Sequence, residues 1–213
     1  MLTVHHLGRS QSERIVWLCE ELGLDYELKR YDRDPVTLQA PAAYKALHPM
    51  GTAPVVTDGE LVLAESGAIV EYIIAKYGEG RLQLPSDHAD FADYLFWLHF
   101  ANGSLQASLG RSLVVRRLDP APDHPMALLI KGRVDRALGT LDARLADASY
   151  LAGSEFTAAD IMTVFCLTTM RTFVPVDLGP YPNVLAYLRR IGGREGYRRA
   201  MQKGDPEMTP LLT

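Results

Sequence analysis

The segment SQSE, residues 10–13, places two serine hydroxyls directly before a helical pattern. Ser10 followed three residues later by Glu13 has the spacing of a capping box, and Ser12 is a competing N-cap. The first amides of a helix have no intrahelical partners and lie at the positive end of the helix dipole, so an anion beside them is stabilised. The pattern therefore predicts either a plain N-cap or a hydroxyl that partners a bound anion.

The segment GTAPVV, residues 51–56, puts Pro54 in front of an apolar run that is typical of a buried strand. Proline has no N–H to donate and is disfavoured inside a sheet. A cis bond between Ala53 and Pro54 would turn the backbone N–H and C=O of Ala53 outward as an unpaired edge. An extended peptide could bind that edge as an added strand. The pattern alone also fits an ordinary trans proline.

These residues lie in a part of the chain where strands and helices alternate. The predicted elements are a strand at 2–7, a helix at 12–22, a strand at 25–31, a short helix at 42–47, a hairpin turning at Asp58-Gly59 and a helix at 65–78. The strand–helix–strand order makes the first two strands parallel. The order βαβ-α-ββα resembles a thioredoxin-like α/β domain.

The remainder of the chain is predicted to be an all-helical bundle. Residues 91–115 form one long helix, bent at Gly103 or Gly110, and apolar residues at three- and four-residue steps mark another at 127–145. Thr157 and Asp160 in EFTAADI have capping-box spacing at the start of an internal helix. We expect a first domain at 1–78, a linker at 79–87 and an all-helical domain at 88–213.

The composition of the chain argues against several classes of function. The chain has 213 residues, 47% of them hydrophobic, and a net charge of −4, which argues against nucleic acid as a partner. Neither a signal peptide nor a membrane-spanning segment is expected. Cys19 and Cys166 lie in apolar helical patterns, which fits buried thiols in the reducing cytoplasm. The six histidines have no metal-ligand spacing, so no metal is expected.

Together, GTAPVV, the following ESGAIVEYI and the later YLAGSEFTAADI resemble the cytosolic glutathione transferases over essentially the whole chain. The start, MLTVHHL with the RS and R that follow, is similar to the bacterial and fungal branch. The resemblance implies a homodimer that binds glutathione as co-substrate, with no permanently bound cofactor.

The resemblance assigns most of the glutathione site to the first domain. Ala53, before the cis Pro54, pairs its backbone with the cysteinyl part of glutathione, and Glu65 and Ser66 hold the γ-glutamyl amine and carboxylate. Thr52 stands where many relatives have lysine or glutamine. For the glycyl carboxylate, Gln39 is the nearest match and Lys45 the alternative.

Ser10 matches the position of the residue that handles the thiol. A free thiol with a pKa of about 8.5 is only about 3% thiolate at pH 7, so activation requires preferential stabilisation of the thiolate. A hydroxyl hydrogen bond and the helix dipole together have the right size. Ser12 and a nearby backbone amide remain the alternatives.

In the helical domain the resemblance implies a pocket for an apolar electrophile. Tyr94, Asn102, Gln106 and Arg111 are the candidates for its lining or for a contact across the dimer. Relatives of this branch commonly read AEGS where this chain reads ANGS, so Asn102 replaces an acidic residue.

The implied reaction is attack of the glutathione thiolate on an electrophilic carbon to give a thioether. The same site in a glutathione-dependent peroxidase or disulfide reductase is one alternative. A non-catalytic glutathione- or ligand-binding module is the other.

Overall fold

The computed structural model describes residues 1–121 and 123–213, which form two compact units. The first contains Met1–Gln83 and Gly192–Pro210, and the second contains Leu84–Ile191 and Leu211–Thr213. The return of residues 192–210 to the first unit is a feature that the helical pattern of the sequence does not indicate.

A four-stranded mixed sheet forms the framework of the first unit. Its strands are β1 (Leu2–Leu7), β2 (Glu27–Tyr31), β3 (Val55–Asp58) and β4 (Leu61–Ala64), in the order β2-β1-β3-β4. β1 pairs with β2 in parallel, with Val4 opposite Leu28, and with β3 antiparallel, with Val4 opposite Val56. The predicted parallel pair and the thioredoxin-like order of elements are confirmed.

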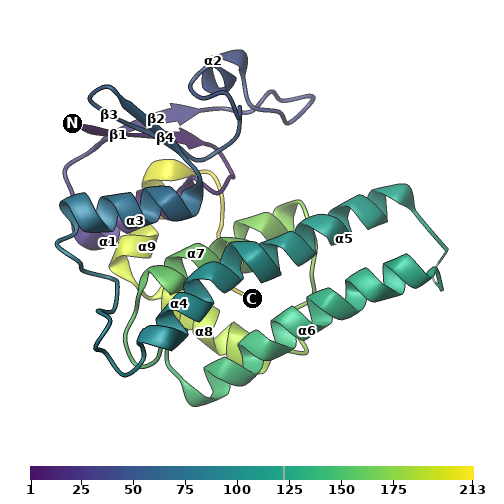
Figure 1. Ribbon diagram of the computed structural model, residues 1–213. Coiled ribbons are helices and arrows are strands. Elements are labelled where there is room, and N and C mark those ends of the chain that lie inside the picture. The colour runs from purple at the N-terminus through teal and green to yellow at the C-terminus, as the bar shows by residue number, and fades with distance from the viewer. Residues whose placement is uncertain (122) are drawn as a thin grey trace. The chain divides into compact units, whose positions relative to one another are not determined.

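Four helices accompany this sheet: α1 (Glu13–Leu22), α2 (Ala42–Lys45), α3 (Ser66–Tyr77) and α9 (Glu195–Gly204). α1, α3 and α9 lie on one face of the sheet and α2 on the other (Figure 1). The predicted apolar face of α1 is buried, because Ile15, Leu18, Cys19 and Leu22 are at most 4% exposed. α9 packs along α1, where Trp17 and Tyr197 meet edge to face.

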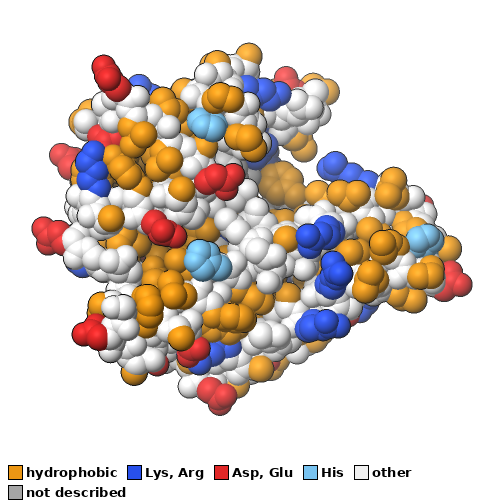
Figure 2. Space-filling view, viewed as in Figure 1, with side chains coloured by type: hydrophobic (Ala, Val, Ile, Leu, Met, Phe, Trp, Pro, Cys, Tyr) orange, Lys and Arg blue, Asp and Glu red, His pale blue; other side chains and the backbone are white. Residues whose placement is uncertain are grey.

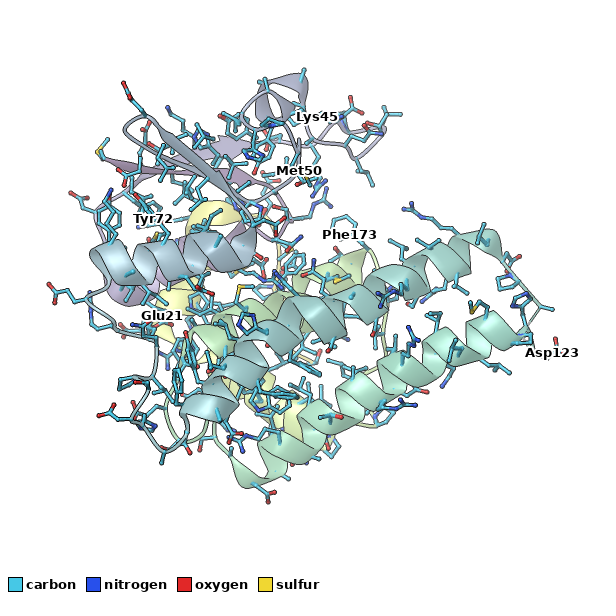
Figure 3. The ribbon with its side chains drawn as sticks, viewed as in Figure 1. Glu21, Lys45, Met50, Tyr72, Asp123 and Phe173 are labelled. Carbon is cyan, nitrogen blue, oxygen red and sulfur yellow. The ribbon has the colours of Figure 1, made fainter. Side chains whose placement is uncertain are left out.

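The hairpin differs from its prediction by one residue. Asp58 still pairs with Leu61, so the two-residue turn is Gly59-Glu60 rather than Asp58-Gly59. Gly59 has a φ of 62°, the left-handed conformation that favours glycine in such a turn. Asp58 stays in the strand while its carboxylate accepts hydrogen bonds from Tyr72 and Lys76 of α3. Figure 3 shows Tyr72 on the side of α3 that faces the sheet.

The regular secondary structure in the described part of the second unit is all helical, with loops between the helices. Its elements are α4 (Phe91–Phe100), the π-helix η1 (Ala101–Gln106), α5 (Ala107–Leu118), α6 (Pro125–Asp147), α7 (Ala158–Leu167), the 3₁₀ turn η2 (Thr169–Thr172) and α8 (Pro182–Gly192). The predicted long helix is therefore continuous but widens into a π-helix around Gly103. Basic side chains gather on the viewed face of α5 and α6 (Figure 2).

The predicted capping box at the start of α7 is confirmed. Thr157 Oγ1 accepts from the N–H of Ala159, and Asp160 Oδ2 accepts from the N–H of Thr157. The other carboxylate oxygen of Asp160 accepts from Tyr187 and from the N–H of Leu151. Within the described ranges, no helix has both the length and the apolar composition needed to cross a membrane.

Candidate functional site

The loop between β1 and α1 brings the two candidate serines together. Ser10 Oγ lies 2.8 Å from Ser12 Oγ and accepts a hydrogen bond from the N–H of Ser12 over 3.2 Å. Ser12 is fully buried, and its hydroxyl also contacts the backbone N–H and C=O of Leu7. Of the two hydroxyls, Ser12 is thus the one enclosed by protein groups.

The predicted capping box at this helix is wrong. α1 begins at Glu13, so Ser12 holds the N-cap position, and its side chain makes no capping hydrogen bond. Ser10 lies two residues earlier, in the turn that leads into the helix, where its C=O accepts from the N–H of Glu13. The hydroxyls of Ser10 and Ser12 bond to each other instead of to the helix, which removes them from the geometry that the spacing predicted.

The bond between Ala53 and Pro54 is cis, as the sequence allowed. Pairing of β3 with its neighbours begins at Val55, so the backbone of Ala53 lies outside both ladders. Ala53 is half-buried and Thr52 is exposed. This arrangement places the backbone of Ala53 directly before the strand, where a peptide could pair with it.

The start of α3 combines a helix N-terminus with a buried cation. Glu65 is exposed and has a φ of 71°, whereas Ser66, the first residue of α3, is 2% exposed. Arg14 of α1 is fully buried and donates from Nη1 to Ser66 Oγ over 3.3 Å. The guanidinium and the positive N-terminal end of α3 make this a favourable place for a carboxylate.

Sequence reasoning gave Arg14 no role in the site. The sequence did contain a signal for this residue, because Arg14 is the second R of the pattern MLTVHHL…RS…R. Its position on the buried side of α1 is unusual for an arginine, since charged side chains are almost never fully buried unless paired.

The two candidates for the glycyl carboxylate are in contact. Lys45 Nζ donates to Gln39 Oε1 over 2.9 Å, and both side chains are exposed. Lys45 is the last residue of α2 and is labelled in Figure 3. With Gln39 Oε1 occupied, the amide of Gln39 and the remaining N–H groups of Lys45 are donors that a carboxylate can share.

The candidates in the second unit lie along α4, η1 and α5. Tyr94 is 4% exposed in α4 and belongs to the core of its unit. Asn102 and Gln106 lie four residues apart on the π-helix, and Gln106 Oε1 accepts a long hydrogen bond of 3.8 Å from Cys166 Sγ. Arg111 is exposed on α5.

Two hollows, one in each unit, are lined by other residues. One of about 480 Å³ in the first unit is lined by Arg9, Arg30, Arg33, Asp205 and neighbouring residues. One of about 610 Å³ in the second unit lies between α5 and α6. Within the described chain, neither lining includes any of the predicted site residues.

Among the described residues there is no solvent-accessible protein thiol and no cluster of side chains that could bind a metal ion. Cys19 and Cys166 are both buried and free. Burial, together with the neighbouring charge of Glu20, raises the pKa of the Cys19 thiol far above its usual range. No group of three or more histidine, cysteine, aspartate or glutamate side chains in the described ranges is arranged to hold a metal ion.

Comparison with known proteins identifies the family. A model of the glutathione S-transferase N-terminal domain matches residues 1–75, and one of the C-terminal domain matches residues 108–195. Glutathione S-transferase 3 of Schizosaccharomyces pombe is 33% identical, over 100% of this chain and 92% of the yeast protein. The chain belongs to the glutathione transferase family.

Solved structures agree with this membership. A glutathione S-transferase from Actinobacillus pleuropneumoniae superimposes with a TM-score of 0.87 and 34% sequence identity, covering 96% of this chain and 93% of the other. The glutathione S-transferase GstB of Escherichia coli is 28% identical over 91% of this chain and 95% of its own length. This glutathione transferase is therefore an enzyme with a thioredoxin-like first domain and a helical second domain.

Proposed function

We propose that this glutathione transferase binds glutathione in its first unit and conjugates the sulfur to an electrophilic carbon, with Ser10 as the thiol partner. The observation that carries the proposal is the position of Ser10 Oγ at the turn into α1, where its hydrogen bonds with the described residues go to Ser12. Ser12 Oγ, in contrast, is fully buried and has four protein contacts. Ser10 thus has an acceptor site left for a ligand, which supports it over Ser12.

The rest of glutathione is proposed to follow the contacts described above. The Ala53 backbone beside Pro54 pairs with the cysteinyl residue. Ser66, supported by Arg14, holds the γ-glutamyl carboxylate, while the exposed Glu65 carboxylate takes the γ-glutamyl amine.

The glycyl end of glutathione is proposed to bind at the C-terminal end of α2. The paired Gln39 and Lys45 bind the glycyl carboxylate. Thr52, before Ala53, is proposed as a further glutathione-binding residue. The electrophile side is proposed to use Tyr94, Asn102, Gln106 and Arg111.

The chemical step follows from the charge that must be stabilised. Lowering the pKa of the thiol by about two units takes about 2.7 kcal/mol of preferential thiolate stabilisation. A hydrogen bond to an ionised group contributes about 1.5–3 kcal/mol. The thiolate sulfur then attacks the electrophilic carbon, a C–S bond forms, and the leaving group departs with its bonding pair.

We further propose that the enzyme is a cytoplasmic homodimer of the bacterial and fungal branch that needs no permanently bound cofactor. The S. pombe relative supports the branch, and the two buried free cysteines fit a reducing compartment. Phe96 of α4 supports the dimer, because it is 54% exposed and stacks on Phe100. The functional domains are proposed to run over 1–78 and 88–213, joined by 79–87.

Product analysis tests the reaction. The enzyme is incubated with glutathione and an activated aryl chloride, and separately with glutathione and an organic hydroperoxide. We expect a thioether with stoichiometric chloride release from the first and little oxidised glutathione from the second. Oxidised glutathione as the dominant product would show a peroxidase instead, and saturable glutathione binding with neither product would show a binding module.

A further inference from the structure

A chain of four buried side chains ends at Ser10. Asp205, directly after α9, contacts His6 Nε2 through Oδ2 at 3.1 Å, and His6 Nδ1 lies 2.9 Å from Ser12 Oγ. Ser12 Oγ lies 2.8 Å from Ser10 Oγ. Between 0% and 8% of each of the four residues is exposed. Residues from both ends of the sequence thus form one hydrogen-bonded line.

Backbone N–H groups donate to three oxygen atoms of this line. The N–H of Leu7 donates to Ser12 Oγ, the N–H of Ser12 donates to Ser10 Oγ, and the N–H of Arg9 donates to Asp205 Oδ1. Burial alone would raise the pKa of Asp205, but the hydrogen bond from His6, the N–H of Arg9 and the nearby charge of Arg30 act against burial, and the pKa lies below its ordinary value. The carboxylate is therefore ionised at neutral pH and accepts a hydrogen bond from the N–H at His6 Nε2.

The remaining hydrogens then have one consistent arrangement while the imidazole is neutral. With the ring proton on Nε2, Nδ1 is an acceptor. Ser12 then donates its one hydroxyl hydrogen to Nδ1 at 2.9 Å rather than to the C=O of Leu7 at 3.3 Å, and Ser10 donates its hydroxyl to Ser12. Ser10 Oγ keeps one lone pair beyond the N–H of Ser12, and that lone pair can accept the S–H of a bound thiol.

We propose that Asp205, His6, Ser12 and Ser10 form a proton relay that carries the glutathione thiol proton to His6 Nδ1. The proposal rests on the proposed role of Ser10 as thiol partner. The S–H proton passes to Ser10 Oγ, the Ser10 proton passes to Ser12 Oγ, and the Ser12 proton passes to His6 Nδ1. The products are a thiolate and an imidazolium, both serines stay neutral, and no other bond changes.

The relay also explains how the Ser10 hydroxyl can first accept the thiol proton and then donate a hydrogen bond to the thiolate. After transfer, every hydrogen bond in the line is reversed, so Ser10 now donates its O–H to the thiolate. The imidazolium is stabilised by the ionised Asp205, as a buried carboxylate stabilises an imidazolium in serine hydrolases. When the thioether leaves, the proton returns along the line to water at Ser10. His6, Ser12 and Asp205 therefore act through Ser10 and touch no substrate.

The packing around His6 suits a fixed ring position. A Cβ on Gly204 would lie 3.1 Å from Nε2, so the end of α9 approaches the ring about as closely as a glycine permits. Charged groups near this pair include Arg30, which is in register with His6 on the adjacent strand β2, and Arg33, whose charge also acts on Asp205. Arg9 and Glu207 line the same hollow as Asp205. Arg30 favours the ionised form of Asp205 and leaves Asp205 as the partner of the imidazolium.

Proton release on glutathione binding tests the relay in the unmodified enzyme. Protons released to a weakly buffered indicator solution are counted against thiolate formed, measured by its ultraviolet absorbance. S-methylglutathione, which has no thiol, gives the background from the rest of the ligand. We expect well under one proton released per thiolate, because His6 keeps it. One proton released per thiolate would overturn the relay.

Two variants test where the thiol proton goes. Ser12→Ala cuts the line and leaves Ser10 in place, and His6→Asn keeps a hydrogen-bonding group near Ser12 but cannot take up a proton. In both, we expect release to rise toward one proton per thiolate and the pKa of the bound thiol to rise by about one, equivalent to about tenfold less thiolate below that pKa. Glu21→Gln is the matched control, because it weakens the Arg194 ion pair that anchors α9 to α1 without touching the line.

These outcomes separate the relay from the role of Ser10. If Ser10→Ala raises the pKa of the bound thiol while Ser12→Ala and His6→Asn leave both readouts at the wild-type values, the relay is wrong and Ser10 acts alone. If Ser10→Ala itself changes nothing, the proposed thiol partner is wrong, whatever His6 does.

Discussion

Arg14 Nη1 lies 3.3 Å from Ser66 Oγ and joins the first turn of α1 to the first residue of α3. Both residues are almost completely inaccessible to solvent. A buried guanidinium beside a helix N-terminus is a strong site for a carboxylate, and glutathione carries one at its γ-glutamyl end.

Ser66→Ala should weaken glutathione binding while leaving the chemical step nearly intact. Losing one hydrogen bond to a carboxylate costs about 1.5–3 kcal/mol, so KM for glutathione should rise at least about tenfold with little change in kcat. Steady-state kinetics with glutathione varied measures both values. An unchanged KM in a variant with wild-type thermal stability would remove Ser66 from the site.

Lys45→Met should affect only the glycyl end of glutathione. We expect the wild-type enzyme to prefer glutathione over γ-glutamylcysteine, which lacks the glycine. The variant should lose about fivefold to tenfold of that preference, because an exposed charge pair contributes about 1 kcal/mol. Kinetics with both peptides give the ratio, and Gln39→Ala should change it in the same direction. A ratio that neither substitution alters would place the glycyl carboxylate elsewhere.

Asp58 links stability to pH. Hydrogen bonds from Lys76, Tyr77 and Tyr72 outweigh burial and hold the pKa of Asp58 well below its ordinary value. A carboxyl whose folded-state pKa is lowered contributes stability above its unfolded pKa of about 3.9, and that stability is lost as the pH falls further. Asp58→Asn should therefore lower Tm by about 2–4 °C at pH 7. The difference from wild type should shrink below about pH 4. Equal Tm values at pH 7 would contradict this account.

Phe96→Glu should disrupt self-association. Phe96 is 54% exposed on α4, and a carboxylate in its place would have to be desolvated in an apolar interface. Sedimentation velocity should give a dimer for the wild type and a monomer for the variant. Lys131→Glu, a charge change on α6, is the control and should remain dimeric. A wild-type monomer would contradict the proposed assembly.

Local signals predicted much of this structure correctly. The capping box of Thr157 and Asp160 was confirmed because both of its hydrogen bonds are made within four residues. The face of α1 that carries Ile15 and Leu18 was confirmed because helical periodicity encodes it directly. At residues 10–13 the same capping pattern failed, since Ser10 and Ser12 found partners in each other.

Sequence patterns could not predict the contacts between residues that are far apart in the chain. Glu20 of α1 binds Lys203 and Arg199 of α9, and His6 meets Asp205 across 199 positions of sequence. No periodicity connects such distant segments, because their contact depends on the return of α9 to the first unit. The histidines were considered only as metal ligands, and their spacing gave no sign of the role inferred for His6.

The most direct test of the central claim is the pKa of the bound thiol, measured from thiolate absorbance of the glutathione complex as the pH is varied. Wild-type enzyme should show a pKa about two below the value of about 8.5 for a free thiol, and Ser10→Ala should raise it by at least about one. A wild-type pKa equal to that of free glutathione, or a Ser10→Ala variant that matches the wild type, would contradict the account.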